Sequence, residues 1–202
     1  MKFINKDTKI FCSFSANPGN NGCIYFNNLF EKQGINAIYK SFYSNNIIES
    51  IQAVKALNIS GFAVSMPFKV EVLKYVDKID DAAAKIGAAN TIINNNGYLT
   101  AYNTDWIGVY KFFKDPPNHI TILGNGGFSK AVQYTCSRLN IDYRLITRKD
   151  WNLLQSIDGT IFNATPVDVD VRGTLIDGRP HTKQGKIIAK HQAFEQFKLY
   201  TK

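Results

Sequence analysis

The chain has 202 residues, of which 45% are hydrophobic and 20% charged, a composition typical of a globular protein with a buried core. Its formal net charge is +8. The lysines and arginines are scattered, however, and no nucleic-acid-binding motif is found. We therefore expect an anionic small molecule, or a surface kept basic for solubility, rather than nucleic acid.

Membrane and secretion signals are absent from the sequence: it has no apolar run of about 18 residues and no signal-peptide pattern at its start. The three cysteines, Cys12, Cys23 and Cys136, stand far apart and form no CxxC pair. This spacing predicts free thiols in a reducing compartment, and neither a disulfide nor a zinc site. We expect a cytoplasmic protein, monomer or homodimer, that binds neither metal nor membrane.

Strands and helices alternate over the first third of the chain. Alternating apolar residues predict strands, and apolar residues at helical spacing predict helices. The predicted strands are 10–15, 35–43 and 62–65, and the predicted helices are 24–30 and 47–60. Short connections between alternating strands and helices favour a mainly parallel sheet covered by helices, which is an α/β fold.

Polar residues stand at the edges of these apolar runs. Ser13 and Ser15 are two apart in a predicted strand, so both hydroxyl groups point to one side and suit a carboxylate. Lys69 opens a segment, 69–79, for which the apolar spacing predicts a helix. Asp105 follows a predicted hairpin. We predict that Lys69 and Asp105 form an acid–base pair that faces a hydroxylated small molecule.

The hairpin covers residues 90–103 and turns at Asn96-Gly97, a dipeptide that favours tight β-turns. A helix over 106–113 follows and ends at Asp115-Pro116-Pro117. The two prolines indicate a break, after which a fresh strand begins.

A strand, a glycine turn and a helix then follow one another at 119–123, 124–127 and 128–139. Glycines in such a turn let backbone N–H groups approach a pyrophosphate at the helix N-terminus. The next predicted strand, 143–147, ends at Arg148. A basic residue there favours the 2′-phosphate of NADP over the free ribose of NAD, and a solvated basic turn is the alternative.

The rest of the chain is less regular. A strand predicted within 159–166 ends in Asn163-Ala164-Thr165, and a closing helix over 187–200 carries Gln192. Between them, residues 167–186 show no clear period and are expected to be mostly loop.

Several of these residues belong to short motifs that follow one another along the chain. They are Ser13-Phe14-Ser15, Asn27 with Phe30, Val64-Ser65-Met66-Pro67-Phe68-Lys69, Ala89-Asn90-Thr91, Asn103-Thr104-Asp105, Gly124-Asn125-Gly126-Gly127 with Ala131, Thr147-Arg148, Asn163-Ala164-Thr165, and Gln192-Ala193 with Phe197. In this order they resemble the motifs of the shikimate dehydrogenase family, and most closely its divergent shikimate/quinate 5-dehydrogenase-like branch.

The resemblance implies an NADP-dependent oxidoreductase of chorismate and aromatic amino acid biosynthesis, with NAD as the less favoured cofactor. It would transfer hydride between NADP(H) and shikimate or 3-dehydroshikimate, or a similar polyol acid such as quinate. It implies that Lys69 moves the hydroxyl proton and that Asp105 hydrogen-bonds the neighbouring hydroxyl. Substrate-binding residues would be Ser13, Ser15, Ser65, Asn90 and Gln192. Cofactor-binding residues would be Gly124, Asn125, Gly126, Gly127, Thr147, Arg148, Asn163 and Thr165, and no metal is implied.

The resemblance also implies two domains. Residues 1–105 would form the substrate-binding domain, with the helix 187–202 packing back near it, and residues 106–186 would form a shortened Rossmann-like cofactor domain. The shortening shows in the small separation of Arg148 from Asn163. It shows too in the absence of the family's Tyr-Asp…Tyr-x-Pro motif after Thr165.

Two alternatives remain. One is a catalytically weak or inactive homologue that binds a shikimate-like molecule in a binding or regulatory role, as the reduced second half suggests. The other is a different oxidoreductase of the same architecture, such as a relative of methylene-tetrahydrofolate dehydrogenase. The Ser-x-Ser and Asn-Thr-Asp motifs count against the latter.

Overall fold

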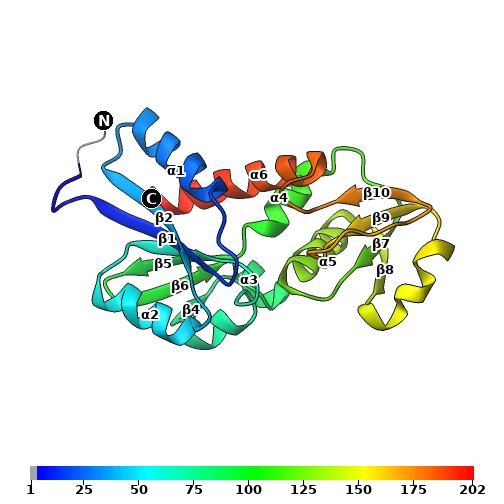
Figure 1. Ribbon diagram of the computed structural model, residues 1–202, viewed down its shortest axis with the longest axis horizontal. Coiled ribbons are helices and arrows are strands. Elements are labelled where there is room, and N and C mark those ends of the chain that lie inside the picture. Colours follow the sequence, from blue (N-terminus) through cyan, green and yellow to red (C-terminus); the bar gives the residue numbers. More distant parts are fainter. Residues whose placement is uncertain (1–3) are drawn as a thin grey trace. The chain divides into compact units, whose positions relative to one another are not determined.

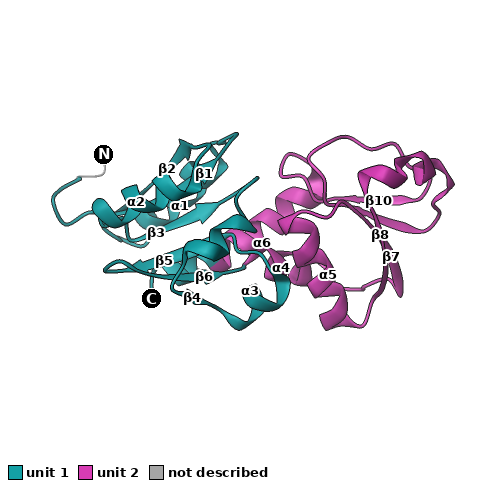
Figure 2. Cartoon of the chain, turned by 90° about the horizontal axis from the view of Figure 1, so that it is seen from below, with its two compact units in different colours: residues 1–103, 196–202 teal, residues 104–195 magenta. Residues whose placement is uncertain are grey.

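The computed structural model describes residues 4–202 and divides the chain into two compact units (Figure 2). Unit 1 comprises Met1–Asn103 and Gln196–Lys202, and unit 2 comprises Thr104–Glu195. From the sequence, we predicted a first domain of residues 1–105 with the helix 187–202, and a second domain of residues 106–186. The search for a signal peptide began at residue 1, and residues 1–3 lie outside the described part of the chain.

Unit 1 is built on a mixed sheet. Its strands are β1 (Lys9–Ser15), β2 (Ala37–Tyr43), β3 (Gly61–Val64), β4 (Lys78–Ile79), β5 (Thr91–Asn95) and β6 (Tyr98–Tyr102). Their order across the sheet is β2-β1-β3-β5-β6-β4. Strand β1 runs parallel to β2 and β3, whereas β5 runs antiparallel to both β3 and β6. The carboxyl ends of β1, β3 and β6 and the start of β5 therefore share one edge of the sheet.

Helices cover this sheet (Figure 1). They are α1 (Asn21–Lys32), α2 (Ile47–Ala56), the 3₁₀-helix η1 (Glu71–Tyr75), α3 (Asp81–Ile86) and the last residues of α6 (Lys183–Tyr200). Helix α2 begins where the side chain of Asn46 accepts hydrogen bonds from the N–H groups of Ile48 and Glu49, which satisfies two donors that the helix itself leaves unpaired. The apolar face of α2 packs on β1 and β3 in a core with Cys12, Phe14 and Phe62.

The predicted helix over 69–79 is wrong. The segment forms only η1 and then strand β4, which pairs parallel with β6. The β-branched residues Val70, Val72 and Val76 weaken a helix, and pairing with β6 supplies the backbone hydrogen bonds instead. The predicted turn at Asn96-Gly97 joins β5 to β6, and both residues have positive φ, of 51° and 91°.

Unit 2 has a parallel sheet. Its strands are β7 (His119–Leu123), β8 (Asp142–Ile146), β9 (Thr160–Asn163) and β10 (Thr174–Asp177), and its helices are α4 (Asp105–Phe112), α5 (Gly127–Leu139), the 3₁₀-helix η2 (Arg148–Ser156) and most of α6. The strands lie in the order β10-β9-β7-β8 (Figure 1). Residues 167–186, expected to be mostly loop, include β10, because a strand this short leaves too little periodicity to recognise.

The order of these strands creates a point where the chain changes direction across the sheet. From β7 the chain passes through α5 to β8 on one side, and then through η2 to β9 on the other side of β7. Ligands of open parallel sheets bind at the carboxyl ends of the strands at such a switch point. The prediction of an α/β fold with two domains is confirmed. Within the described residues, no helix is long and apolar enough to cross a membrane.

Candidate functional site

The Ser-x-Ser motif and the segment from Ser65 to Lys69 lie side by side at the edge of unit 1. Ser15 ends β1 and Ser65 follows β3, the neighbouring strand. The N–H of Ser65 donates to the carbonyl of Phe14 at 3.1 Å, and Ser15 Oγ donates to the carbonyl of Met66 at 3.4 Å. Backbone pairing of two strands thus joins two motifs that are far apart in the sequence.

A third motif is joined to these two by backbone hydrogen bonds. The N–H of Ala89 donates to the carbonyl of Lys69 at 2.7 Å, and the N–H of Val64 donates to the carbonyl of Asn90 at 3.0 Å. The side chain of Asn90 is buried, with 2% of its surface exposed. Asn90 is thereby held beside the segment that carries Lys69.

The Asn-Thr-Asp motif reaches the same edge through Asn103. The N–H of Asn90 donates to the carbonyl of Tyr102 at 3.1 Å, and Asn103 Nδ2 donates to the carbonyl of Ala88 at 2.9 Å. Asn103 therefore ties the end of β6 to the turn before β5. Three motifs that the sequence singled out, and the first residue of a fourth, therefore meet within unit 1.

The two serine hydroxyls already have protein partners. Ser13 Oγ donates to Ser41 Oγ at 3.1 Å, and Ser15 Oγ accepts from the N–H of Asn17 at 3.0 Å while donating to Met66. A serine hydroxyl has one proton to donate. A ligand carboxylate must therefore compete with Ser41 and Met66 for these protons.

Asp105 and Gln192 belong to unit 2. Asp105 is the first residue of α4 and is 3% exposed, and a carboxylate in a first helical turn is favoured by the helix dipole. Gln192 lies on α6, where Gly108 of α4 allows close approach, because a Cβ at Gly108 would stand 2.9 Å from Gln192 Cβ. The pairing of Lys69 with Asp105 and the substrate contact of Gln192 stay predictions.

The glycine turn connects β7 to α5 in unit 2. Gly124 has a φ of +102°, which favours glycine, and a Cβ there would stand 3.0 Å from Thr165 Cγ2. Gly126 precedes α5 without a side-chain cap, and no carboxylate stands in the first turn of this described helix. A Cβ at Gly126 would meet no described atom within 4 Å. The turn thus leaves space for a phosphate group at the N-terminus of a long helix.

Residues after β8 and β9 complete this edge of unit 2. Thr147 Oγ1 donates to Asp150 Oδ2 at 3.0 Å as part of a capping box that starts η2, and Arg148 beside it is exposed. After β9, Thr165 N–H and Oγ1 donate to Asn163 Oδ1 at 3.0 and 2.7 Å. The side chains of Thr147, Asn163 and Thr165 therefore order their own loops.

These groups fit a dinucleotide. The glycine turn and the ends of β8 and β9 meet where the strand order changes direction, as the N–H of Gly124 donates to the carbonyl of Ile146 at 2.9 Å and that of Ala164 to the carbonyl of Leu123 at 3.1 Å. The open space above Gly126 suits a pyrophosphate, and the exposed guanidinium of Arg148 suits a further phosphate.

Two of the three thiols are buried. All three cysteines are free, as predicted, and burial raises the pKa of Cys136 to about 11 and that of Cys12 still further. Among the described residues, no group of three or more His, Cys, Asp or Glu side chains is placed to hold a metal ion.

A hollow near the end of β2 is lined by Asn45, Asn46, Phe68, Glu49 and Glu71, among others. Its two carboxylates disfavour an anionic ligand, so we do not assign it to the substrate.

The sequence analysis missed two buried residues with polar side-chain groups, Gln196 and Tyr200, which are hydrogen-bonded to each other. Gln196 and Tyr200 are four residues apart, so they share one face of α6. Polar residues on the buried face of a helix were the signal that could have revealed them.

The chain was compared with known proteins. Residues 22–92 match the model of the shikimate dehydrogenase substrate binding domain. A shikimate dehydrogenase-like protein of Haemophilus influenzae is 43% identical over 133 residues, which are 64% of this chain and 49% of the relative. The shikimate dehydrogenase (NADP(+)) of Pyrococcus furiosus is 40% identical over 143 residues, 67% of this chain and 52% of the relative.

A solved structure of a shikimate 5-dehydrogenase-like protein is similar over 98% of this chain and 93% of its own, with a TM-score of 0.80 and 29% identity. In sequence, the chain spans about half the length of the curated relatives that it matches. The resemblance inferred from the motifs is confirmed: this chain is related to the shikimate dehydrogenases, and its residues 22–92 match the substrate-binding domain of that family.

Proposed function

We propose that the chain is an NADP-dependent oxidoreductase of the shikimate dehydrogenase type. Its substrate would be shikimate or 3-dehydroshikimate, or a similar polyol acid such as quinate. The observation that carries the proposal is the meeting of three motifs, and the first residue of a fourth, at one edge of the unit 1 sheet, joined by the hydrogen bonds of Ser65, Ala89 and Asn103. The names of the relatives support the substrate class and the cofactor.

In this proposal each polar group of unit 1 has a separate task. Ser13 and Ser15 bind the carboxylate of the substrate, and Ser65 and Asn90 bind ring hydroxyl groups. Lys69 Nζ takes the proton from the reacting hydroxyl during oxidation and returns it during reduction, as alcohol chemistry requires. From unit 2, Asp105 accepts a hydrogen bond from the neighbouring hydroxyl and orients Lys69, and Gln192 binds a further hydroxyl.

Unit 2 would hold the cofactor, whose nicotinamide accepts or supplies the hydride when bound. The backbone of the glycine turn, Gly124-Asn125-Gly126-Gly127, would cradle the pyrophosphate. Arg148 would bind the 2′-phosphate through its guanidinium. Thr147, Asn163 and Thr165 would shape the loops that face the nucleotide.

The test is a set of titrations of the purified chain with shikimate, NADP and NAD, together with an assay of NADPH formation from shikimate and quinate. We expect binding of shikimate and NADP and measurable turnover. Binding of NADP without binding of any polyol acid would reject the proposed substrate class.

The second candidate is a binding homologue without hydride transfer. The short connection through η2 favours it. Shikimate binding without nucleotide binding, and without turnover, would select this candidate over the oxidoreductase.

A further inference from the structure

Gln196 on α6 links two parts of unit 1 through the two hydrogens of its side-chain amide. Its Nε2 donates to Thr91 Oγ1 at 3.0 Å and to Tyr200 Oη at 3.1 Å. Gln196 is 2% exposed and Thr91 is fully buried. Hydrogen bonds between buried polar groups fix geometry strongly, because breaking them leaves groups without a partner away from water.

On one side the chain of hydrogen bonds reaches Asn90. Thr91 Oγ1 accepts from Gln196 and donates its own proton to Asn90 Oδ1 at 3.0 Å. Because Oδ1 is the acceptor in this contact, the amide of Asn90 is turned so that its Nδ2 hydrogens lie on the opposite side. This hydrogen bond therefore fixes the orientation of the side chain to which the proposed function assigns a ring hydroxyl group.

On the other side Gln196 reaches a pair of neighbouring tyrosines. Its Nε2 donates to Tyr200 Oη at 3.1 Å, and the ring of Tyr200 lies 6.3 Å from that of Tyr39. Both tyrosines are buried, and burial raises the pKa of each hydroxyl, so they stay protonated at neutral pH. The hydroxyl group of Tyr200 is therefore a neutral partner that anchors the amide of Gln196 on this side.

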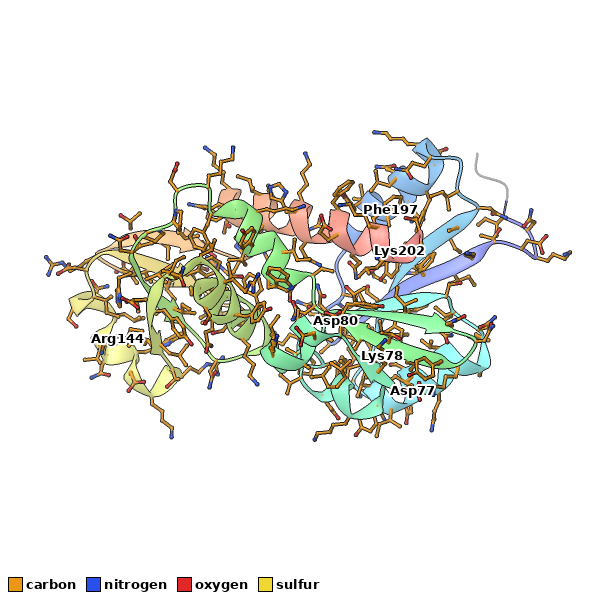
Figure 3. The ribbon with its side chains drawn as sticks, turned by 180° about the vertical axis from the view of Figure 1, so that it is seen from behind. Asp77, Lys78, Asp80, Arg144, Phe197 and Lys202 are labelled. Atoms are coloured by element: carbon orange, nitrogen blue, oxygen red, sulfur yellow. The ribbon has the colours of Figure 1, made fainter. Side chains whose placement is uncertain are left out.

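Aromatic packing holds this part of α6 in place. The ring of Phe197, labelled in Figure 3, lies 5.5 Å from that of Phe30, and the ring of Tyr200 lies 4.4 Å from that of Phe11. Gly61 allows the close approach, because a Cβ there would stand 3.1 Å from Tyr200 Cε1. Gln196 is thus presented to Thr91 by a well-packed helix end.

We infer that Gln196 is a positioning residue of the substrate site, which orients the amide of Asn90 through Thr91. The inference deepens the proposed function and rests on it for the identity of the ligand. The orientation of the Asn90 amide, in contrast, can be measured without any ligand.

The first test replaces the amide of Gln196 by an apolar group of similar length. Gln196→Met is expected to raise the Kd of shikimate roughly threefold to tenfold, the value of one or two neutral hydrogen bonds, and to leave the Kd of NADP unchanged. Gln52→Met makes the same chemical change at an exposed position of α2 and is expected to change neither. Thr91→Val breaks the same link without touching α6, and it is used if Gln196→Met does not fold.

The double variant separates positioning from a structural role. If Gln196 acts through Asn90, Gln196→Met adds little to the loss of shikimate affinity caused by Asn90→Ala. Additive losses would overturn the inference, as would equal losses of shikimate and NADP affinity.

The last measurement needs no substrate. The side-chain NH₂ signal of Asn90, assigned by its disappearance in Asn90→Ala, is expected to shift or broaden in Gln196→Met and to stay unchanged in Gln52→Met. An unchanged signal in Gln196→Met overturns the inference. If the wild-type chain binds no shikimate, the proposed substrate fails, and this signal alone decides the role of Gln196.

Discussion

Asn27 on α1 makes two hydrogen bonds with the backbone of a single residue, Tyr39 on β2. Its Nδ2 donates to the carbonyl of Tyr39 at 2.9 Å, and the N–H of Tyr39 donates to its Oδ1 at 2.8 Å. Strand β2 is at the edge of its sheet, so these backbone groups have no neighbouring strand to pair with. Asn27 satisfies both of them at the edge of the sheet.

Asn27→Ala is expected to lower the free energy of unfolding by about 2 kcal/mol, because the variant leaves two backbone groups of Tyr39 without their partner. Urea denaturation followed by circular dichroism measures the change. Asn28→Ala, at the exposed neighbouring position, is expected to stay within about 0.5 kcal/mol of the wild type. Equal stability of the two variants would show that water replaces Asn27 at the sheet edge.

Lys69→Met is expected to lower kcat at least about 100-fold, because no other group is proposed to move the hydroxyl proton. The fold and the Kd of NADP should be retained, as measured by circular dichroism and by titration. Lys74→Met, at an exposed lysine of η1, serves as the matched control. Turnover that survives in Lys69→Met would remove the lysine from the mechanism.

Arg148→Ala is expected to weaken binding of NADP much more than binding of NAD, since only NADP carries the 2′-phosphate. Titration of both nucleotides against the variant measures the ratio of the two dissociation constants. Arg144→Ala removes an exposed arginine from β8 itself (Figure 3) and should leave this ratio unchanged. An equal loss for NADP and NAD would contradict the 2′-phosphate role.

The glycine turn allows binding and stability to be separated. Gly126 has a φ of −85° and open space around its Cβ position, so Gly126→Ala should keep the stability of the wild type and lose affinity for NADP. Gly124→Ala should instead lower stability by about 1 kcal/mol or more, since its φ of +102° strains an alanine. Thermal unfolding and nucleotide titration of both variants test this contrast. Wild-type NADP affinity in Gly126→Ala would argue against a pyrophosphate at this turn.

Ser41→Ala is expected to strengthen shikimate binding. In the structure, Ser13 Oγ donates its only proton to Ser41 Oγ at 3.1 Å, and removing that acceptor makes the proton available to a carboxylate. A neutral hydrogen bond of about 1 kcal/mol corresponds to a gain of roughly fivefold in affinity. Calorimetric titration gives the Kd, and a weaker affinity in the variant would show that Ser41 supports the clamp instead of competing with it.

Several features of this protein follow from short stretches of sequence. The alternation of strands and helices, the hairpin at Asn96-Gly97 and the glycine turn before α5 were all predicted correctly. They depend on local propensity, turn chemistry and the period of apolar residues, which a single stretch contains. The family resemblance could be recognised from the sequence as well, because each motif is itself a short stretch of neighbouring residues.

Other features were decided by the tertiary structure. The segment after Lys69 lost its predicted helix because pairing of β4 with β6 satisfies its backbone. Thr91 and Gln196 are 105 residues apart, and their hydrogen bond exists only because aromatic packing brings the end of α6 onto the sheet of unit 1. Local patterns contain no information about such contacts, since a buried polar partner is set by the packing of distant segments and not by neighbours in the chain.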